Sequence, residues 1–319
     1  MVNDSSSGDA GWPAGTADGS LLVRGVTVRF GGLTALDDVS LTAGPRQVTG
    51  IIGPNGAGKT TLLNVLCGFV KPDAGQIQFD RREVTNLRPH RLAGLGIART
   101  LQSVGLFGGL SVVENVMVGA TSQARAGFWS ALLGLARSDR DERALRERAM
   151  QALDRVGIAD LADQLPGALP HGPRKRVALA RALVAEPRLL LLDEPASGLS
   201  ENELPELGEL MTTLVKDTSV VVIEHRMDLM MAVCDTIFVL DFGKVIAAGA
   251  PEHVQSDPAV TAAYLGAEDV AAEDGDLLIA GTAPAADVPA AGLPAEEPPG
   301  TAAAGSTGSA GEDARTADE

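Results

Sequence analysis

The stretch QVTGIIGPNGAGKTTLLNVLCG, residues 47–68, decides the fold of this chain. Residues 47–52 are typical of a buried strand, and residues 59–68 are typical of a helix. Between them, residues 53–60 fit the pattern G-x-x-x-x-G-K-[ST] in the strand-to-helix context that the pattern requires. Glycines let backbone N–H groups wrap a phosphate, and the N-terminus of the helix attracts its negative charge. The stretch therefore predicts a nucleoside triphosphate site.

Within this phosphate loop, Lys59 is expected to reach the β- and γ-phosphates and Thr60 to supply an oxygen to Mg²⁺. A purely structural turn is a poor alternative, because the four fixed positions would coincide by chance in roughly one such chain in a hundred. The residues expected to contact the nucleotide here are Gly53, Pro54, Asn55, Gly56, Ala57, Gly58, Lys59, Thr60 and Thr61.

A second acidic element follows in LLLLDEP, residues 189–195, where an apolar strand ends in two carboxylates. Beside a phosphate loop, Asp193 is expected to hold Mg²⁺, and Glu194 to polarise a water that faces the γ-phosphate. The alternative, an acidic turn before Pro195, would be equally good if this element stood alone.

Buried runs alternate with helical segments along the middle of the chain, which predicts an α/β fold with a mainly parallel sheet. Strands are expected at residues 21–30, 36–44, 188–192, 219–224 and 235–241, and a helix at residues 201–217. Residues 111–165 differ and predict an inserted helical subdomain. There, Leu145, Ala149, Ala152, Leu153 and Val156 form one apolar stripe.

Composition divides the chain into three parts. Residues 1–20 are rich in Gly, Ser and Asp, and residues 266–319 contain 12 acidic residues and one basic residue. Neither end can bury enough apolar surface to offset its ordering entropy, so both are expected to be disordered. Residues 21–265 form the expected folded domain, with its helical subdomain at about residues 103–185.

Charge and cysteine content exclude several classes of function. Most of the net charge of −16 lies in the two ends, so the expected domain lacks the basic excess of a nucleic-acid-binding protein. Cys67 and Cys234 are too few and too far apart for a disulfide framework or a zinc site. The N-terminus has neither the basic nor the apolar region of a secretory signal, and no segment is apolar enough to span a membrane.

With LPHGPRKR (residues 169–176) between them, the phosphate loop and the acidic strand resemble the nucleotide-binding subunit of ABC transporters, over roughly residues 21–265. The resemblance implies the ABC ATPase fold, in which antiparallel N-terminal strands and an inserted α-helical subdomain accompany the parallel sheet. It also implies that ATP and Mg²⁺ bind and that ATP is hydrolysed.

Further positions match this family in the same order along the chain. The resemblance implies that Phe30 stacks on adenine and that Gln102 touches Mg²⁺ and the attacking water. It likewise makes Glu194 the catalytic carboxylate and His225 the switch histidine at the γ-phosphate. Taken singly, Phe30 could be a core aromatic, Gln102 a solvated loop residue and His225 a structural histidine.

The segment LPHGPRKR departs from the family signature, which reads roughly L-S-G-G-Q. In the family, this loop clasps the γ-phosphate of the ATP bound to the opposite subunit. Pro170, His171 and Pro173 replace the Ser, the first Gly and the Gln, whereas Gly172 remains. The replaced family residues should weaken the clasp. Because proline is tolerated in the first turn of a helix, we expect the clasp still to work. A solvated basic face formed by residues 174–176 is the alternative. Ser200 also stands where many members have Asp.

The stretches RTLQSVGLFGGLSVVENVMVG (residues 99–119) and IEHRMDLMMAVCDTIFVLDFGKVIAAGAPEHV (residues 223–254) resemble the ATPase subunits of branched-chain (hydrophobic) amino acid importers. This implies a second ATPase subunit, identical or different, two membrane permeases, an indirect solute-binding protein and no nucleic acid. It places the chain in the cytoplasm, peripheral on the inner face of the plasma membrane. Importers of urea, amides or other small solutes, and non-transport ABC ATPases, remain alternatives.

Overall fold

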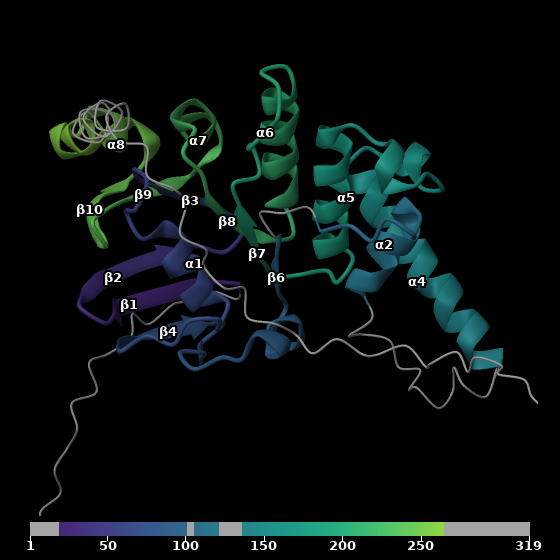
Figure 1. Cartoon of the computed structure of the whole chain (residues 1–319), viewed down its shortest axis with the longest axis horizontal. Coiled ribbons are helices and arrows are strands. Elements are labelled where there is room, and N and C mark those ends of the chain that lie inside the picture. The colour runs from purple at the N-terminus through teal and green to yellow at the C-terminus, as the bar shows by residue number, and fades with distance from the viewer. Residues whose placement is uncertain (1–18, 101–104, 121–135, 265–319) are drawn as a thin grey trace, which may run out of the picture. The chain divides into compact units, whose positions relative to one another are not determined.

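A computed structural model describes residues 19–100, 105–120 and 136–264, and its secondary structure forms two sheets with helices (Figure 1). The antiparallel sheet has the strand order β2-β1-β4-β5, and the other sheet has the order β10-β9-β3-β8-β7-β6. The strands are β1 (Leu21–Phe30), β2 (Leu33–Ala43), β3 (Val48–Ile52), β4 (Ala74–Phe79), β5 (Arg82–Glu83), β6 (Ile97–Arg99), β7 (Leu189–Asp193), β8 (Ser219–Ile223), β9 (Thr236–Asp241) and β10 (Lys244–Gly249).

The larger sheet is mainly parallel, as the sequence predicted. Its strands β9, β3, β8, β7 and β6 pair in parallel, and only β10 runs antiparallel, against β9. Both faces are covered, which explains the unbroken apolar runs. In β7, Leu189 and Leu191 join one hydrophobic cluster, and their neighbours Leu190 and Leu192 join the other.

The antiparallel sheet packs on the first of these clusters together with helix α1 (Lys59–Leu66). Leu62 and Leu63 of α1 are fully buried in the same cluster as Ile51 of β3 and Val26 of β1. Figure 1 shows α1 near β1 and β2. Helices α6 (Glu203–Leu214) and α7 (Met227–Val233) lie on the other side of the larger sheet from α1. The family's antiparallel N-terminal strands are therefore present.

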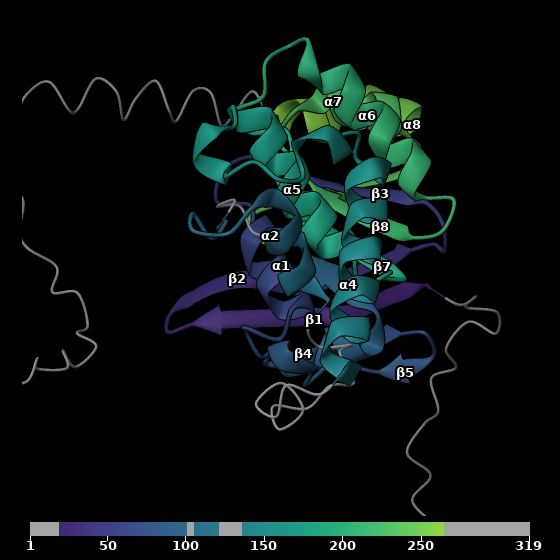
Figure 2. The same ribbon diagram turned by 90° about the vertical axis from the view of Figure 1, so that its right-hand side faces the viewer.

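The second cluster contains buried side chains of the remaining helices, whose ribbons are drawn in Figure 2. On α4, Ala149, Ala152 and Leu153 are buried, which confirms the predicted apolar stripe. Helix α2 begins at a capping box between Ser111 and Glu114. These helices are α2 (Val112–Gly119), α4 (Ala136–Arg155), α5 (His171–Leu183), α6 (Glu203–Leu214), α7 (Met227–Val233) and α8 (Pro251–Ser256).

Both cysteines are buried and unpaired, in agreement with the sequence analysis. Burial raises the pKa of the Cys67 thiol to about 11 and that of Cys234 to about 12. Within the described part of the chain, no helix is long and apolar enough to cross a membrane. The expected terminal segments lie outside the described residues, apart from residues 19 and 20.

Candidate functional site

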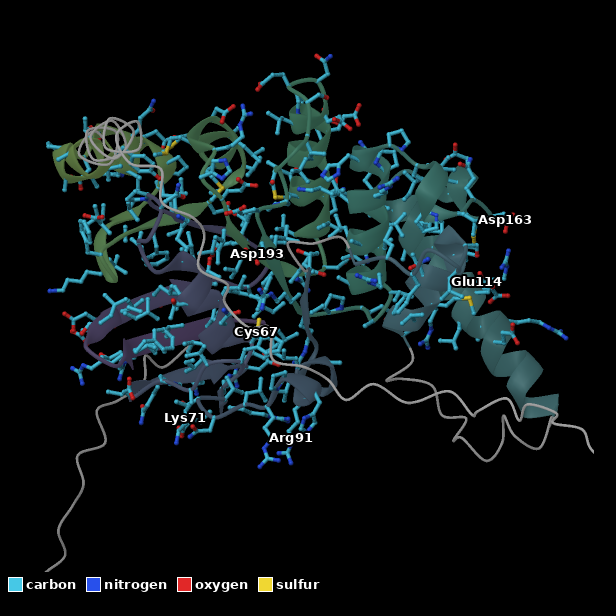
Figure 3. All side chains as sticks on the ribbon, in the orientation of Figure 1. Cys67, Lys71, Arg91, Glu114, Asp163 and Asp193 are labelled. Carbon is cyan, nitrogen blue, oxygen red and sulfur yellow. The ribbon has the colours of Figure 1, made fainter. Side chains whose placement is uncertain are left out.

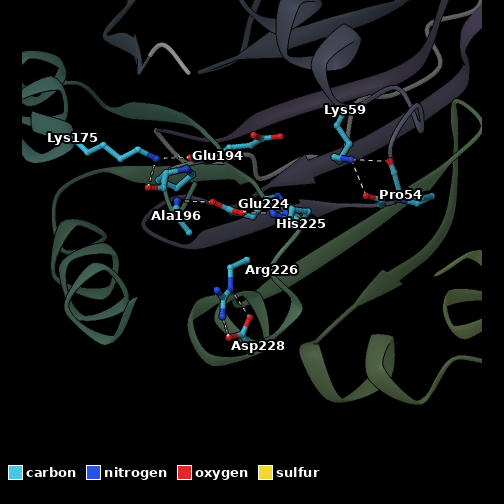
Figure 4. A network of polar contacts seen from close by, with 11 residues as sticks. Pro54, Lys59, Lys175, Glu194, Ala196, Glu224, His225, Arg226 and Asp228 are labelled. Atoms are coloured by element: carbon cyan, nitrogen blue, oxygen red, sulfur yellow. Dashed lines mark hydrogen bonds and ion pairs between the residues drawn. The ribbon is translucent and has the colours of Figure 1, made fainter. Parts of the chain in front are cut away.

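Three neighbouring parallel strands bring the predicted site together at one edge of the larger sheet. Asp193 of β7 pairs with Ile223 of β8, and Ile223 pairs with Ile51 of β3. The Glu194 N–H donates to the Ile223 carbonyl, and the Glu224 N–H donates to the Ile51 carbonyl. Because the carboxyl ends of parallel strands meet at the same edge, motifs more than 100 residues apart become neighbours. Figure 4 shows residues from these strand ends in one view.

The phosphate loop joins β3 to α1 through a backbone that only glycine adopts easily. Gly58 has φ of 103° and precedes the first residue of α1. A Cβ at Gly58 would lie 2.7 Å from the Ala35 carbonyl oxygen and 2.9 Å from Leu36 Cδ2. Any other residue would therefore be strained and would also collide with β2. The first amides of α1, which lack helical partners, can then face a phosphate.

The Lys59 side chain contacts the backbone of the phosphate loop. Its Nζ donates to the carbonyl oxygens of Gly53, at 2.7 Å, and Pro54, at 2.8 Å. The side chain is buried, and desolvation lowers its pKa, although the charge of Glu194 opposes this shift. The two carbonyls hold the ammonium group at the loop without neutralising it. A bound phosphate would accept a charge-assisted hydrogen bond from this ammonium group, which is stronger than a bond to a neutral carbonyl oxygen.

A pocket of about 350 Å³ opens beside this loop. Its lining includes Lys59, Thr60, Thr61, Glu194 and Phe30, so the predicted phosphate, catalytic and adenine contacts share one space. Phe30 ends β1 and is 51% exposed, so it is not a core aromatic. Glu194 has a φ of 45°, which is uncommon for a non-glycine residue and is often found at functional sites.

Asp193, the expected magnesium ligand, is held by a residue that the sequence analysis missed. Its Oδ2 accepts a hydrogen bond from an Arg99 Nη at 3.0 Å, and both side chains are largely buried. Arg99 also donates to Asn64 Oδ1 of α1. Its Cζ lies 5.7 Å from the centroid of the Phe69 ring. Arg99 ends β6, beside β7 in the sheet, and this pairing was not visible from sequence spacing.

Replacing Arg99 with alanine should lower the free energy of unfolding by about 3–5 kcal/mol, because Asp193 would become a buried carboxylate without its ion pair. Arg146→Ala is the matched control. It removes an equally short ion pair to Asp163 whose two side chains are exposed, on the α4 side of the protein (Figure 3). The control should cost less than about 1 kcal/mol. Urea unfolding measures both variants, and equal losses would contradict the assigned difference.

The residues present fit a magnesium ion. Mg²⁺ in nucleotide sites takes hard oxygen ligands from one or two protein groups together with the phosphates and water. The Thr60 hydroxyl, on an exposed residue at the start of α1, and the Asp193 carboxylate are such ligands. No group of three or more His, Cys, Asp or Glu side chains that could hold a metal by itself occurs among the described residues.

Glu224 is a second residue that the sequence analysis did not single out. Its side chain is fully buried, and a buried carboxylate needs hydrogen-bond donors. Its Oε1 accepts from the Ala196 N–H at 2.6 Å, and its Oε2 accepts from the His225 N–H at 3.1 Å. The His225 Nδ1 lies 3.6 Å from the same Oε2. Glu224 therefore links the predicted switch histidine to the segment that follows Glu194 (Figure 4).

The divergent signature loop still leads into a helix, α5, which begins at His171 with Pro170 as its N-cap. Pro173 is therefore the third residue of this helix. Proline is compatible with this first turn, because its missing N–H would have no partner within the helix. Gly172 is buried, and an added Cβ there would collide with the Glu203 carboxylate.

The basic run at the start of α5 does not form the solvated face that was weighed as an alternative. Arg174 donates to the carbonyls of Pro166 and Gly167, and Lys175 donates to those of Glu194 and Pro195. Arg176 bonds to the Val156 carbonyl and to Glu206. Desolvation lowers the pKa of Lys175, while the charges of Glu224 and Glu194 oppose this. The run fastens α5 to neighbouring segments, and Figure 4 shows the part of it formed by Lys175 and Glu194.

Two other predicted features have different outcomes. Gln102 lies outside the described residues, so its place remains a prediction. In the loop of residues 197–200, the Ser200 Oγ donates to Glu203 Oε2 at 2.6 Å. Hydrogen bonds from Ser200 are the main cause that lowers the pKa of the Glu203 carboxyl. Ser200 is thus engaged within its own subunit.

The sequence matches the family model for ABC transporters over residues 36–197, and the model for branched-chain amino acid ATP-binding cassette transporters over residues 244–270. The chain is similar to the high-affinity branched-chain amino acid transport ATP-binding protein LivG of Salmonella typhimurium. The two are 40% identical over 248 residues, which cover 77% of this chain and 97% of LivG.

Among solved structures, the fold is similar to the ADP conformation of MJ1267, an ATP-binding cassette of an ABC transporter. The TM-score is 0.68 at 31% identity, with 77% of this chain and 98% of that one covered. The dimeric bacterial ABC transporter cassette MJ0796 gives a TM-score of 0.61 at 25% identity, over 72% and 98% of the two chains. The phosphate loop and the two carboxylates at the end of β7 agree with these matches. The chain belongs to the family of ABC transporter ATP-binding proteins.

Proposed function

We propose that this chain is the ATP-hydrolysing subunit of an importer for branched-chain or other hydrophobic amino acids. One observation supports the ATPase chemistry above all. A desolvated Lys59, which donates to two loop carbonyls, lines the same pocket as Glu194. The solute is inferred from the match of residues 244–270 and from the name of the LivG relative.

In the proposed reaction, Lys59 and the α1 amides bind the β- and γ-phosphates and orient them. When bound, Mg²⁺ would be held by Thr60 and Asp193 and would neutralise phosphate charge. Glu194, which lines the same pocket, accepts a proton from the attacking water. His225 steadies the γ-phosphate, with Glu224 holding its backbone, and Gln102 contributes from the segment before α2.

The proposed active unit contains two such ATPase subunits, identical or paired with a sister subunit. Each site is completed by Gly172 and the N-terminus of α5 from the other subunit. The dimeric cassette among the similar structures supports this arrangement. Two membrane permeases would dock near Gln102 and the following insertion. That would place the chain at the cytoplasmic face of the membrane, and a solute-binding protein would deliver the solute.

Uptake of radiolabelled solute tests this function. Cells that lack the chain should lose leucine uptake, and the full-length chain should restore it. The Glu194→Gln variant should not restore uptake, because it should bind ATP without turning it over. Urea and a short amide, added in parallel, distinguish the alternative solutes. Leucine uptake that persists without the chain would overturn the proposed solute. A loss of urea uptake alone would indicate urea as the solute instead.

A further inference from the structure

Exposed apolar side chains gather at one place in the described structure. Six large apolar residues are exposed among the described residues: Phe30, Leu33, Phe69, Phe107, Leu165 and Phe242. Three of these, Phe30, Leu33 and Phe242, line the pocket that also contains Lys59. Phe242 is the most exposed of the six, at 86%. Single exposed apolar residues are ordinary, but a group of three at one pocket indicates a binding surface.

Phe242 stands in a turn position that disfavours it. Residues 242 and 243 form the two-residue loop between β9 and β10, because Asp241 pairs directly with Lys244. Phe242 has a φ of 40°, and Gly243 has a φ of 77°. A hairpin loop with two positive φ values strongly prefers Asn-Gly or Asp-Gly, and a bulky residue there is an outlier. Such outliers cluster at active sites and ligand clamps.

The turn is fastened to the phosphate loop and to β2. The Gly243 N–H donates to the Ala57 carbonyl at 3.0 Å, and the Gly243 carbonyl accepts from the Asp37 N–H at 2.8 Å. Lys244 Nζ forms an ion pair with Asp37 Oδ2 at 3.2 Å. Because the backbone of the turn is bonded directly to the loop that would hold the phosphates, the backbone at Phe242 is fixed relative to that loop.

We propose that Phe242 is a second aromatic contact for the nucleobase, opposite the predicted stacking residue Phe30. This rests on the proposed nucleotide site and adds a residue to it. Each base has two π-faces, and base–aromatic stacking tolerates any base. Phe242 therefore increases affinity for any nucleoside triphosphate over a bare triphosphate chain and does not discriminate adenine from guanine.

The Phe242→Asn variant removes the aromatic ring without disturbing the turn, because asparagine suits the positive φ and keeps the hairpin. Its melting temperature should be no lower than that of the unmodified chain. The Kd for Mg-ATP should rise about 5- to 30-fold, and that for Mg-GTP by a similar factor. The Kd for Mg-tripolyphosphate, which has no base, should change less than about twofold. Phe242→Trp should retain ATP affinity, since it keeps an aromatic face.

Isothermal titration of the full-length chain with these three probes decides the proposal. Leu165→Ala, an exposed apolar residue that does not line the pocket, is the matched control and should change no Kd. An unchanged Kd for ATP in Phe242→Asn would overturn the inference, as would an equal loss of tripolyphosphate affinity. If the unmodified chain bound neither ATP nor tripolyphosphate, the proposed function itself would fail, and the two failures are thus distinguishable.

Discussion

Replacing Glu194 with glutamine should abolish ATP turnover while leaving ATP binding intact. Glutamine has the same shape but cannot accept the proton of the attacking water, and loss of a general base typically costs about 100- to 10,000-fold in rate. The backbone bond from the Glu194 N–H to the Ile223 carbonyl is unchanged by the substitution, so the strand end should keep its geometry. Phosphate release measures turnover, and equilibrium binding of labelled ATP measures affinity.

The matched control is Glu209→Gln, because Glu209 is an exposed carboxylate of α6 that does not line the nucleotide pocket. This control should hydrolyse ATP at the unmodified rate. Full activity in Glu194→Gln would refute the assigned base. Loss of binding together with turnover would instead give Glu194 a role in holding the nucleotide.

Lys59→Ala should lose both ATP binding and turnover. The ammonium group is the buried cation that lines the pocket beside Glu194, and it contacts the carbonyls of Gly53 and Pro54. A charge-assisted bond contributes about 1.5–3 kcal/mol, so ATP affinity should fall by roughly 10- to 100-fold. The rate should fall by a further factor of about 100 or more, because the same charge faces the phosphates as their charge develops.

Lys71→Ala is the control, since Lys71 is an exposed lysine on the loop after α1 and lies apart from Asp193 (Figure 3). It should leave the Kd for ATP and the hydrolysis rate unchanged. Binding should be measured by titration at fixed ionic strength, because phosphate contacts depend on salt. A Lys59→Ala variant that binds ATP normally would remove the central contact of the proposed site.

The sequence predicted the main architecture because its signals were local and repeated. The strand before residue 53, the helix after it and the apolar runs at β7, β8 and β9 are each encoded by consecutive residues. The structure confirmed these elements, the mainly parallel sheet and the stripe on α4. Strands β4, β5, β6 and β10 were not predicted: β5 and β6 are short, β4 lacks a continuous apolar run, and the apolar run of β10 was not recognised as a strand.

Within the site, the sequence identified the loop of residues 53–61 and the pair Asp193 and Glu194, and the structure brought these to one sheet edge. The partners Arg99 and Glu224 were missed, because an arginine and a glutamate at strand ends carry no motif. The alternative of a solvated basic face at residues 174–176 was wrong. The partners of this run are backbone carbonyls, which no sequence pattern reports.

The sequence alone determined which functional groups the site contains: a glycine loop with Lys59 for phosphates, and carboxylates at the end of an apolar strand. Those features depend on neighbouring residues, and local spacing encodes them. Only the tertiary structure decided which charges meet. Parallel pairing of β6 with β7 puts Arg99 against Asp193, and the β9–β10 turn carries Phe242 to the phosphate loop. Such contacts arise from strand order and burial, which join residues far apart in the chain.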